Sequence, residues 1–413
     1  MREGLPWGPC LTTLEARASV ARAAVDSGPL PAEARTTPRA ARAFTFSRHP
    51  EEHPISFQPD TLAIHAGQAP DVVGEGPATR ELALGDFVTA SGETLSGLRL
   101  RYRVVGDTEA ARENGWILVF HALTGSADAE AWWGPLIGPD KALDTSRHAI
   151  VSANLLGSCY GSTGPMEWAA EHDEPFPDLT PADLALAHVP LLAHLGVERL
   201  ALATGGSLGG MVTLEWGRRS SVPVDRLVVF AAPTATSAQA IAWNTVQRMA
   251  IEADPAWRRG RYLPGRGPVA GLAAARALAM ITYRSSIEFD ARFGRTSSRT
   301  PGRFDVDHYL RRQGDKLVAR FDAASYIALM RAMDLHDMGD VAAAARETAE
   351  RVRTVIGVGV DTDILYFPEE VRAWTDAYRA AGVDARYREI RSASGHDAFL
   401  IEWDQVEAIL REV

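Results

Sequence analysis

The sequence is poor in cysteine, in lysine and in long apolar runs, and each shortage excludes a class of protein. Cys10 and Cys159, the two cysteines of the 413 residues, have no metal or redox spacing, which favours the reducing cytoplasm. Lys141 and Lys316 are the two lysines, so few residues are available for Schiff-base chemistry. No apolar run approaches the roughly 18 residues of a transmembrane helix. The net charge of -10 opposes nucleic-acid binding. We therefore expect no nucleic acid, no membrane and no metal.

Residues 205–210 read Gly-Gly-Ser-Leu-Gly-Gly and lie between two contrasting segments. The apolar run 200–203 predicts a buried strand, and 211–216 predicts the start of a helix. A strand, a G-x-S-x-G turn and a helix form the nucleophile elbow of α/β-hydrolases. The turn requires a strained backbone at Ser207 and small neighbours beside it. Ser207 is thus the predicted nucleophile, and the alternative is a glycine-rich turn with an idle serine.

From about residue 82, apolar segments alternate with helical ones. The segment 98–105 alternates with period two, as an edge strand does. Residues 181–195 have helical spacing, and Pro190 predicts a kink there. Further strands are expected at 116–120, 148–153, 226–232, 352–360 and 385–390. This alternation predicts an α/β fold, the α/β-hydrolase fold, with a mostly parallel, doubly wound sheet.

The chain divides into an extension, a core and an insertion. Residues 1–80 show weak periodicity and predict a poorly structured N-terminal extension. Residues 81–233 and 346–413 form the expected α/β core. The helix-rich stretch 234–345 contains no strand pattern, which favours a helical cap inserted between late strands over a longer crossover.

Two further residues complete a catalytic triad by their order in the chain. Asp361 and Asp363 follow the expected strand 352–360, and His396 follows the last strand. Parallel α/β sheets place their sites at these strand ends. In this fold the order is serine, acid, histidine. His396 is the predicted base and Asp363 the residue that orients it, with Asp361 as the rival acid.

An oxyanion hole is expected from two backbone amides. One follows the nucleophile, and the other belongs to the loop after an early strand. These are the Leu208 amide and, in the loop 121–125, the Leu123 amide. The alternative for Leu123 is plain packing.

Motifs spread over residues 84–410 point to one family. They are 121–125 (His-Ala-Leu-Thr-Gly), 132–133, 137–139, 154–165, 205–216, 281–284, 320–326 and 395–400. In this order they resemble the homoserine O-acetyltransferases, the acyltransferase branch of the α/β-hydrolases.

The resemblance implies a ping-pong O-acyltransferase in which Ser207 is acylated by acetyl-CoA and L-homoserine then accepts the acyl group. It implies no bound cofactor, a homodimer, and an amino acid held by Arg276 and Asp397. Arg276 would pair with the α-carboxylate and Asp397 with the α-ammonium. Succinyl-CoA as donor, serine as acceptor and a serine esterase remain alternatives. Arg276 as a cap-surface residue and Asp397 as a partner of His396 also remain open.

Overall fold

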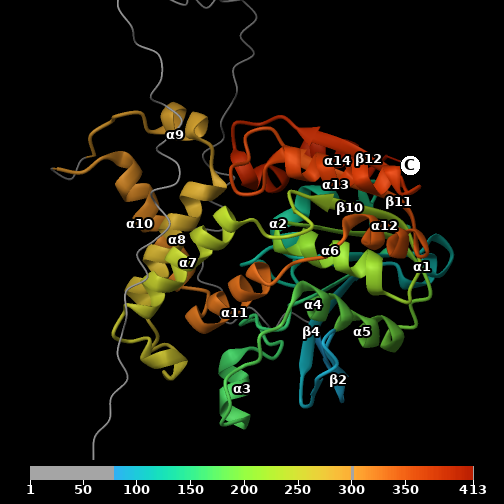
Figure 1. The fold of residues 1–413 in the computed structure, drawn as a ribbon, viewed down its shortest axis with the longest axis horizontal. Coiled ribbons are helices and arrows are strands. Elements are labelled where there is room, and N and C mark those ends of the chain that lie inside the picture. The colour runs from blue at the N-terminus through green and yellow to red at the C-terminus, as the bar shows by residue number, and fades with distance from the viewer. Residues whose placement is uncertain (1–78, 299–301, 413) are drawn as a thin grey trace, which may run out of the picture. The chain divides into compact units, whose positions relative to one another are not determined.

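Eight strands form one sheet in the computed structural model, which describes residues 79–298 and 302–412 (Figure 1). Their order across the sheet is β1 (Thr79–Ala83), β4 (Arg99–Gly106), β8 (Ala149–Ala153), β5 (Trp116–Phe120), β9 (Leu200–Gly206), β10 (Val224–Phe230), β11 (Val352–Val360) and β12 (Asp384–Ile390). Strand β4 pairs antiparallel with β1 and β8, and the other neighbours pair in parallel. The predicted α/β-hydrolase fold with its mostly parallel sheet is confirmed.

The strand predicted at 98–105 is not at the edge. The structure places β4 between β1 and β8, and β1 forms the edge of the sheet. The reason is that β1 starts at Thr79, so its first residues fall in the predicted extension. The rest of that extension, residues 1–78, lies outside the described residues. The other predicted strands are confirmed in β5, β8, β9, β10, β11 and β12.

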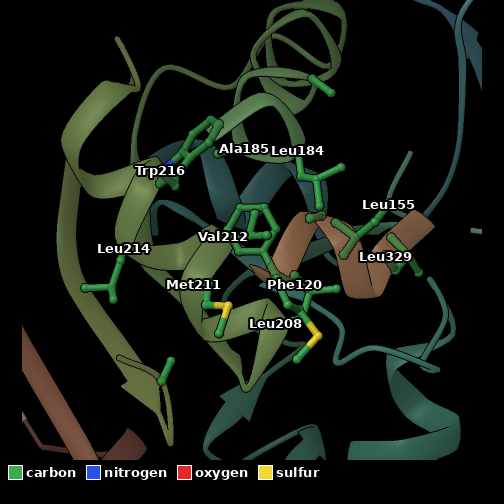
Figure 2. Close-up of a cluster of buried hydrophobic side chains, with 14 of the residues drawn as sticks. Phe120, Leu155, Leu184, Ala185, Leu208, Met211, Val212, Leu214, Trp216 and Leu329 are labelled. Carbon is green, nitrogen blue, oxygen red and sulfur yellow. The ribbon is translucent and has the colours of Figure 1, made fainter. Parts of the chain in front are cut away.

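The sheet is covered on both faces, as its uninterrupted apolar strands predict. In β5, Leu118 and Phe120 belong to one buried cluster, whereas Ile117 and Val119 belong to a second. Successive side chains of a strand point to opposite faces, so these clusters lie on opposite sides of the sheet. Figure 2 shows part of the first cluster, in which Phe120 lies among side chains of helix α6 (Leu208–Arg219).

Helices form a layer on each face. On the face of α6, that helix packs against α4 (Pro181–Leu186) and α12 (Val341–Ala349), while α13 (Pro368–Ala380) packs on β11 and β12. The second cluster includes residues of α2 (Ala129–Trp133), η2 (Gly134–Leu136) and α14 (Trp403–Leu410). The remaining short elements of the core are α1 (Thr108–Asn114), α3 (Pro165–Glu171), β2 (Phe87–Val88), β3 (Thr94–Leu95), β6 (Ile137–Gly138), β7 (Leu143–Asp144) and η4 (Gly395–Leu400).

The helix predicted over 181–195 is broken in two. Helix α4 ends at Leu186, and α5 (His188–His194) follows after Ala187. Pro190 has no amide hydrogen for the Leu186 carbonyl four residues earlier, and its ring crowds that carbonyl. The helix therefore breaks in the turn before Pro190, between Leu186 and His188.

Most of the chain between β10 and β11 is helical. We call its first helices the insertion: α7 (Ala238–Glu252), η3 (Arg258–Gly260), α8 (Val269–Tyr283), α9 (Ser286–Arg292), α10 (Asp305–Val318) and α11 (Ala323–Asp334). Helix α8 packs between α7 and α10, and the three lie together in Figure 1. Helix α12 packs on α6 and α13 instead, so the boundary expected at residue 345 falls inside a helix of the core face. Among the described helices none has the length and apolarity to cross a membrane.

Candidate active site

Ser207 lies at the turn between β9 and α6 in a strained conformation. Its φ is 58° and its ψ is -125°, a region that non-glycine residues rarely adopt. A side chain on Gly206 would collide with the ring of Phe399, at 2.6 Å from Cδ2. A side chain on Gly209 would overlap the backbone oxygen of Phe120. The predicted strain is confirmed, and close packing around the turn explains why glycine occupies these neighbouring positions.

The structure joins His396 and Asp363. His396 lies in η4, after β12, and its Nδ1 is 2.7 Å from Oδ2 of Asp363. The other carboxylate oxygen of Asp363 accepts hydrogen bonds from the amides of Leu365 and Tyr366, at 2.8 and 3.1 Å. These bonds fix the orientation of the carboxylate. Because a carboxylate oxygen can only accept, Nδ1 of the imidazole carries a hydrogen and donates a hydrogen bond to Asp363.

The rival acid has a different partner. Oδ1 of Asp361 accepts the amide hydrogen of Ser392 at 2.9 Å, which ties together the two loops that follow β11 and β12. Asp363 is buried, whereas the Asp361 bond is exposed. The geometry therefore pairs the histidine with Asp363.

The imidazole of His396 is buried and its second nitrogen is unoccupied. No hydrogen bond joins Nε2 to Ser207 or to another of the described residues. The rings of Tyr366, Tyr283 and Phe399 surround it, with centroids 5.3, 5.7 and 5.8 Å away. Burial lowers the pKa of His396, but the charge and hydrogen bond of Asp363 outweigh it, and the pKa is raised. A neutral Nε2 in this dry setting is a proton acceptor of increased basicity.

The two amides predicted to form an oxyanion hole belong to buried residues. Leu208 is the first residue of α6, and Leu123 lies in the loop after β5. Neither amide donates a hydrogen bond within residues 79–298 and 302–412. At Leu208 the free amide lies at a helix N-terminus, where the helix dipole favours negative charge. Gly209 packs against the backbone of Phe120 and His121, which places the first turn of α6 against the end of β5.

Arg276 lies on α8 beside an aromatic ring of the site. Its guanidinium carbon is 5.4 Å from the ring centroid of Tyr283, the residue whose ring faces His396. Burial raises the pKa of Tyr283, and the positive charge of Arg276 opposes this rise. Arg276 is half-buried. The ion pairs of the described residues, from Arg99–Glu81 to Arg411–Glu407, do not include it. The cation is therefore available to an anionic ligand.

Asp397 is paired with a residue to which the sequence assigned no role. Its Oδ2 is 3.2 Å from Nη2 of Arg284, which is buried at the end of α8. Glu288 lies on the other side of Arg284, with its Oε2 3.1 Å from Nη1. Oδ1 of Asp397 has no hydrogen-bond partner in the described part of the chain, so one oxygen remains open. In the sequence, the only indication that Arg284 belongs to the site is its position in the motif 281–284.

The insertion also contacts the catalytic loops at two other points. The hydroxyl of Ser285 donates a hydrogen bond to the carbonyl of Ala393, three residues before His396. Nη1 of Arg320 donates to the carbonyl oxygen of Thr124 and the hydroxyl of Tyr160, at 2.7 and 2.6 Å. Thr124 follows Leu123 directly, so Arg320 supports the loop that carries one of the two free amides. Sequence reasoning did not identify Arg320 or Ser285 as residues of the site.

The described residues contain no cluster of three or more histidine, cysteine, aspartate or glutamate side chains that could hold a metal ion. The groups that the site presents are a serine, a histidine, carboxylates and two free backbone amides. These are the parts that an acyl transfer through a serine ester requires.

Comparison with known proteins identifies relatives of the chain. A family model described as the alpha/beta hydrolase fold matches residues 115–334. The homoserine O-acetyltransferase of Thermus thermophilus is 44% identical over 351 residues, covering 78% of this chain and 88% of that protein. That of Moorella thermoacetica is 42% identical over 342 residues, covering 78% of this chain and 91% of that protein.

Solved structures give the same fold. The homoserine O-acetyltransferase of Staphylococcus aureus is 29% identical and has a TM-score of 0.65, covering 80% of this chain and 93% of that chain. Esterase E22 is 21% identical with a TM-score of 0.72, and covers 81% of this chain and 98% of that chain. At that identity the likeness to the esterase concerns the fold alone.

Proposed function

Because the chain belongs to the homoserine O-acetyltransferase family, we propose that it transfers the acetyl group of acetyl-CoA to the hydroxyl of L-homoserine through an acyl-Ser207 intermediate. Its substrates are small molecules. The observation that carries the proposal is the buried Asp363–His396 pair, with its free Nε2, in a fold that holds Ser207 in a strained turn. Acetyl-CoA is a co-substrate, and no bound cofactor takes part.

In the first half-reaction, Oγ of Ser207 attacks the thioester carbonyl carbon while Nε2 of His396 takes its proton. The carbonyl oxygen becomes an oxyanion and accepts hydrogen bonds from the Leu123 and Leu208 amides. The tetrahedral intermediate then collapses, the carbon–sulfur bond breaks, and His396 returns the proton to the departing CoA sulfur. Asp363 stabilises the imidazolium that forms in between.

In the second half-reaction the acceptor hydroxyl attacks the acyl-serine ester. His396 now removes the proton of that hydroxyl, the oxyanion forms at the same amides, and the proton returns to Oγ of Ser207. The products are O-acetyl-L-homoserine and the free serine. Transfer to an alcohol in preference to water requires a site from which water is excluded, and we propose that the insertion acts as the cap that excludes it.

We assign the acceptor's α-carboxylate to Arg276 and its α-ammonium to Asp397. Arg276 is a cation without an ion pair among the described residues, and one oxygen of Asp397 is open. The charges of both residues act on Tyr283, whose ring lies beside the imidazole. Two opposite charges in this one site fit a zwitterion whose hydroxyl side chain reaches Nε2. A simple ester substrate has no use for both charges.

The homodimer and the cytoplasmic location remain part of this proposal. Light scattering coupled to size-exclusion chromatography measures the first: a mass near twice the chain's 44.7 kDa is expected. A monomer at assay concentration would contradict it.

Thiol release tests the proposed function. The purified protein is mixed with acetyl-CoA or succinyl-CoA, each alone and with homoserine or serine. We expect a burst of CoA stoichiometric with enzyme from acetyl-CoA alone, and rapid turnover when homoserine is added. Faster turnover with succinyl-CoA or serine would reassign the donor or the acceptor. Turnover with water as fast as with homoserine would identify an esterase.

The variant Ser207→Ala removes the attacking oxygen and is expected to abolish the burst. Ser152→Ala is the matched control, because Ser152 is a buried serine of β8 whose hydroxyl has no hydrogen-bond partner among the described residues. It should release CoA like the unmodified protein. A burst that persists in Ser207→Ala would exclude Ser207 as the nucleophile.

A further inference from the structure

A buried histidine outside the triad holds the peptide that carries the Leu123 amide. His121 is the first residue after β5, and its side chain is completely buried. Its Nδ1 is 2.7 Å from the carbonyl oxygen of Ala122, and its Nε2 is 3.0 Å from the amide nitrogen of Leu155. The mechanism above leaves this side chain unused.

The contacts of His121 determine its tautomer. The amide of Leu155 can only donate, so Nε2 must be the unprotonated nitrogen that accepts. Burial lowers the pKa of His121 to about 4, although the bond to Ala122 opposes this effect. The ring is therefore neutral near pH 7, its single proton is on Nδ1, and this N–H donates to the Ala122 carbonyl.

The carbonyl of Ala122 and the amide hydrogen of Leu123 belong to the same peptide group. The described chain contains no cis peptide, so the two point in opposite directions in one plane. A second donor, the amide of Gly125, bonds the same carbonyl at 2.9 Å. With its oxygen held from two sides the peptide plane cannot rotate freely, and the Leu123 N–H is directed away from the imidazole.

Hydrogen bonds to a carbonyl also polarise its peptide. Linked hydrogen bonds strengthen one another by roughly 10–30% in condensed phases. The bond from His121 therefore makes the Leu123 amide a stronger donor as well as a better directed one. Because Leu155 follows β8, the imidazole also ties the loop after β5 to the loop after the neighbouring strand.

We propose that His121 is a positioning residue that sets the direction and donor strength of the Leu123 amide in the oxyanion hole. The proposal rests on the proposed function, in which this amide binds the oxyanion. Both half-reactions pass through an oxyanion at the same place, so loss of the Nδ1 donor slows acylation and deacylation together. The homoserine KM should change little, because His121 touches no substrate.

Two near-isosteric variants separate the two hydrogen bonds. In His121→Asn the side-chain amide nitrogen takes the place of Nδ1 and keeps the donor to Ala122, but loses the acceptor for Leu155. In His121→Gln the amide oxygen takes the place of Nε2 and keeps the acceptor, but loses the donor. A merely structural histidine would suffer similarly from both changes.

The matched control is His188→Gln. His188 is also completely buried, and its ring lies 4.8 Å from that of Phe120, the residue before His121. Its Nδ1 bonds the carbonyl of Leu184 in α4 and makes no bond to the peptide that carries the Leu123 amide. This variant is expected to lower the urea midpoint of unfolding without lowering kcat.

The experiment measures the CoA burst rate, kcat and the homoserine KM for all three variants. For His121→Gln we expect about a 10- to 100-fold loss in both half-reactions, part of the 10²–10³ that one oxyanion donor provides. His121→Asn should recover most of this loss. Equal losses in Asn and Gln variants, or an unchanged kcat in the Gln variant, would overturn the proposal.

Nitrogen NMR of the unmodified protein provides a measurement that needs no variant. A protonated Nδ1 with a bare Nε2 at His121 supports the proposal, and a protonated Nε2 overturns it. Failure of the proposed function has a different signature: the unmodified protein would show no acyl-enzyme burst at all.

Discussion

We expect the close packing of Gly209 to set the spacing between the Leu123 and Leu208 amides, and Gly209→Ala tests this expectation. An alanine Cβ there would lie 2.9 Å from the carbonyl oxygen of His121 and closer still to that of Phe120. Ordinary contacts begin near 3.5 Å, and the contact with the Phe120 oxygen falls short of this by more than about 1 Å, so the first turn of α6 must move from β5 by at least that distance. That turn carries the Leu208 amide, whereas the loop after β5 carries Leu123.

We expect this movement to lower kcat clearly and the free energy of unfolding only modestly. Overpacking typically costs about 1–3 kcal/mol, and an alanine inside a helix returns roughly 0.5–1 kcal/mol of that. Displacement of a catalytic group by about 1 Å can cost on the order of 10²-fold in rate, so we expect kcat to fall about 10- to 100-fold. Urea unfolding measures the change in the free energy of unfolding, and steady-state thiol release measures the change in kcat.

Gly217→Ala is the control, because Gly217 lies near the other end of the same helix. There an added Cβ would meet methyl groups of Leu227 and Val352 at 2.8 and 3.4 Å, which are side-chain atoms and not backbone. This variant should leave kcat unchanged. If Gly209→Ala also retains kcat within about threefold while folding normally, the close approach of α6 to β5 does not set the spacing of the amides.

Two further predictions concern the charges around the imidazole. Asp363→Asn removes the charge that raises the pKa of His396, so the acid limb of the kcat/KM profile should move to lower pH. The value of kcat should also fall by on the order of 10⁴, because the imidazole loses its correct tautomer. An acid limb that does not move would show that Asp363 does not control the pKa of the base. Glu288→Gln leaves the charge of Arg284 offset by Asp397 alone, so the homoserine KM should rise roughly 3- to 10-fold, as expected for loss of one partly screened charge, with an unchanged CoA burst. The same KM in the variant and the unmodified protein would remove Glu288 from acceptor binding.

Sequence reasoning identified the features that are encoded locally. The elbow is a run of six residues in which glycines flank a serine. This pattern predicts a tight turn with a strained backbone at the serine, and the φ of 58° at Ser207 agrees with that prediction. The strands were equally readable, because apolar runs predict strands covered on both faces. The positions of Asp363 and His396 followed from a general rule on where parallel strands place their functional loops.

Contacts between distant segments were beyond sequence reasoning. Arg284 and Asp397 are far apart in the chain, and neither residue carries a local signal that the other is its partner. The same holds for Arg320 and Thr124. The edge position was assigned to β4 because its alternating pattern describes one covered face, whereas the pairing partner β1 begins inside the expected extension. Such contacts depend on how the insertion and the core pack, which periodicity does not encode.

The contacts of the insertion with the catalytic loops limit how the enzyme can move. Arg284, Ser285 and Arg320 each bond a loop that the reaction needs in place. If the insertion lifted as a rigid lid, it would release Asp397, the loop before His396 and the oxyanion loop at the same moment. We therefore expect ligand exchange between the two half-reactions to leave these contacts intact. If these three contacts persist, amide hydrogen exchange in the loops that they hold should be slow, and equally slow in the free and the acylated protein.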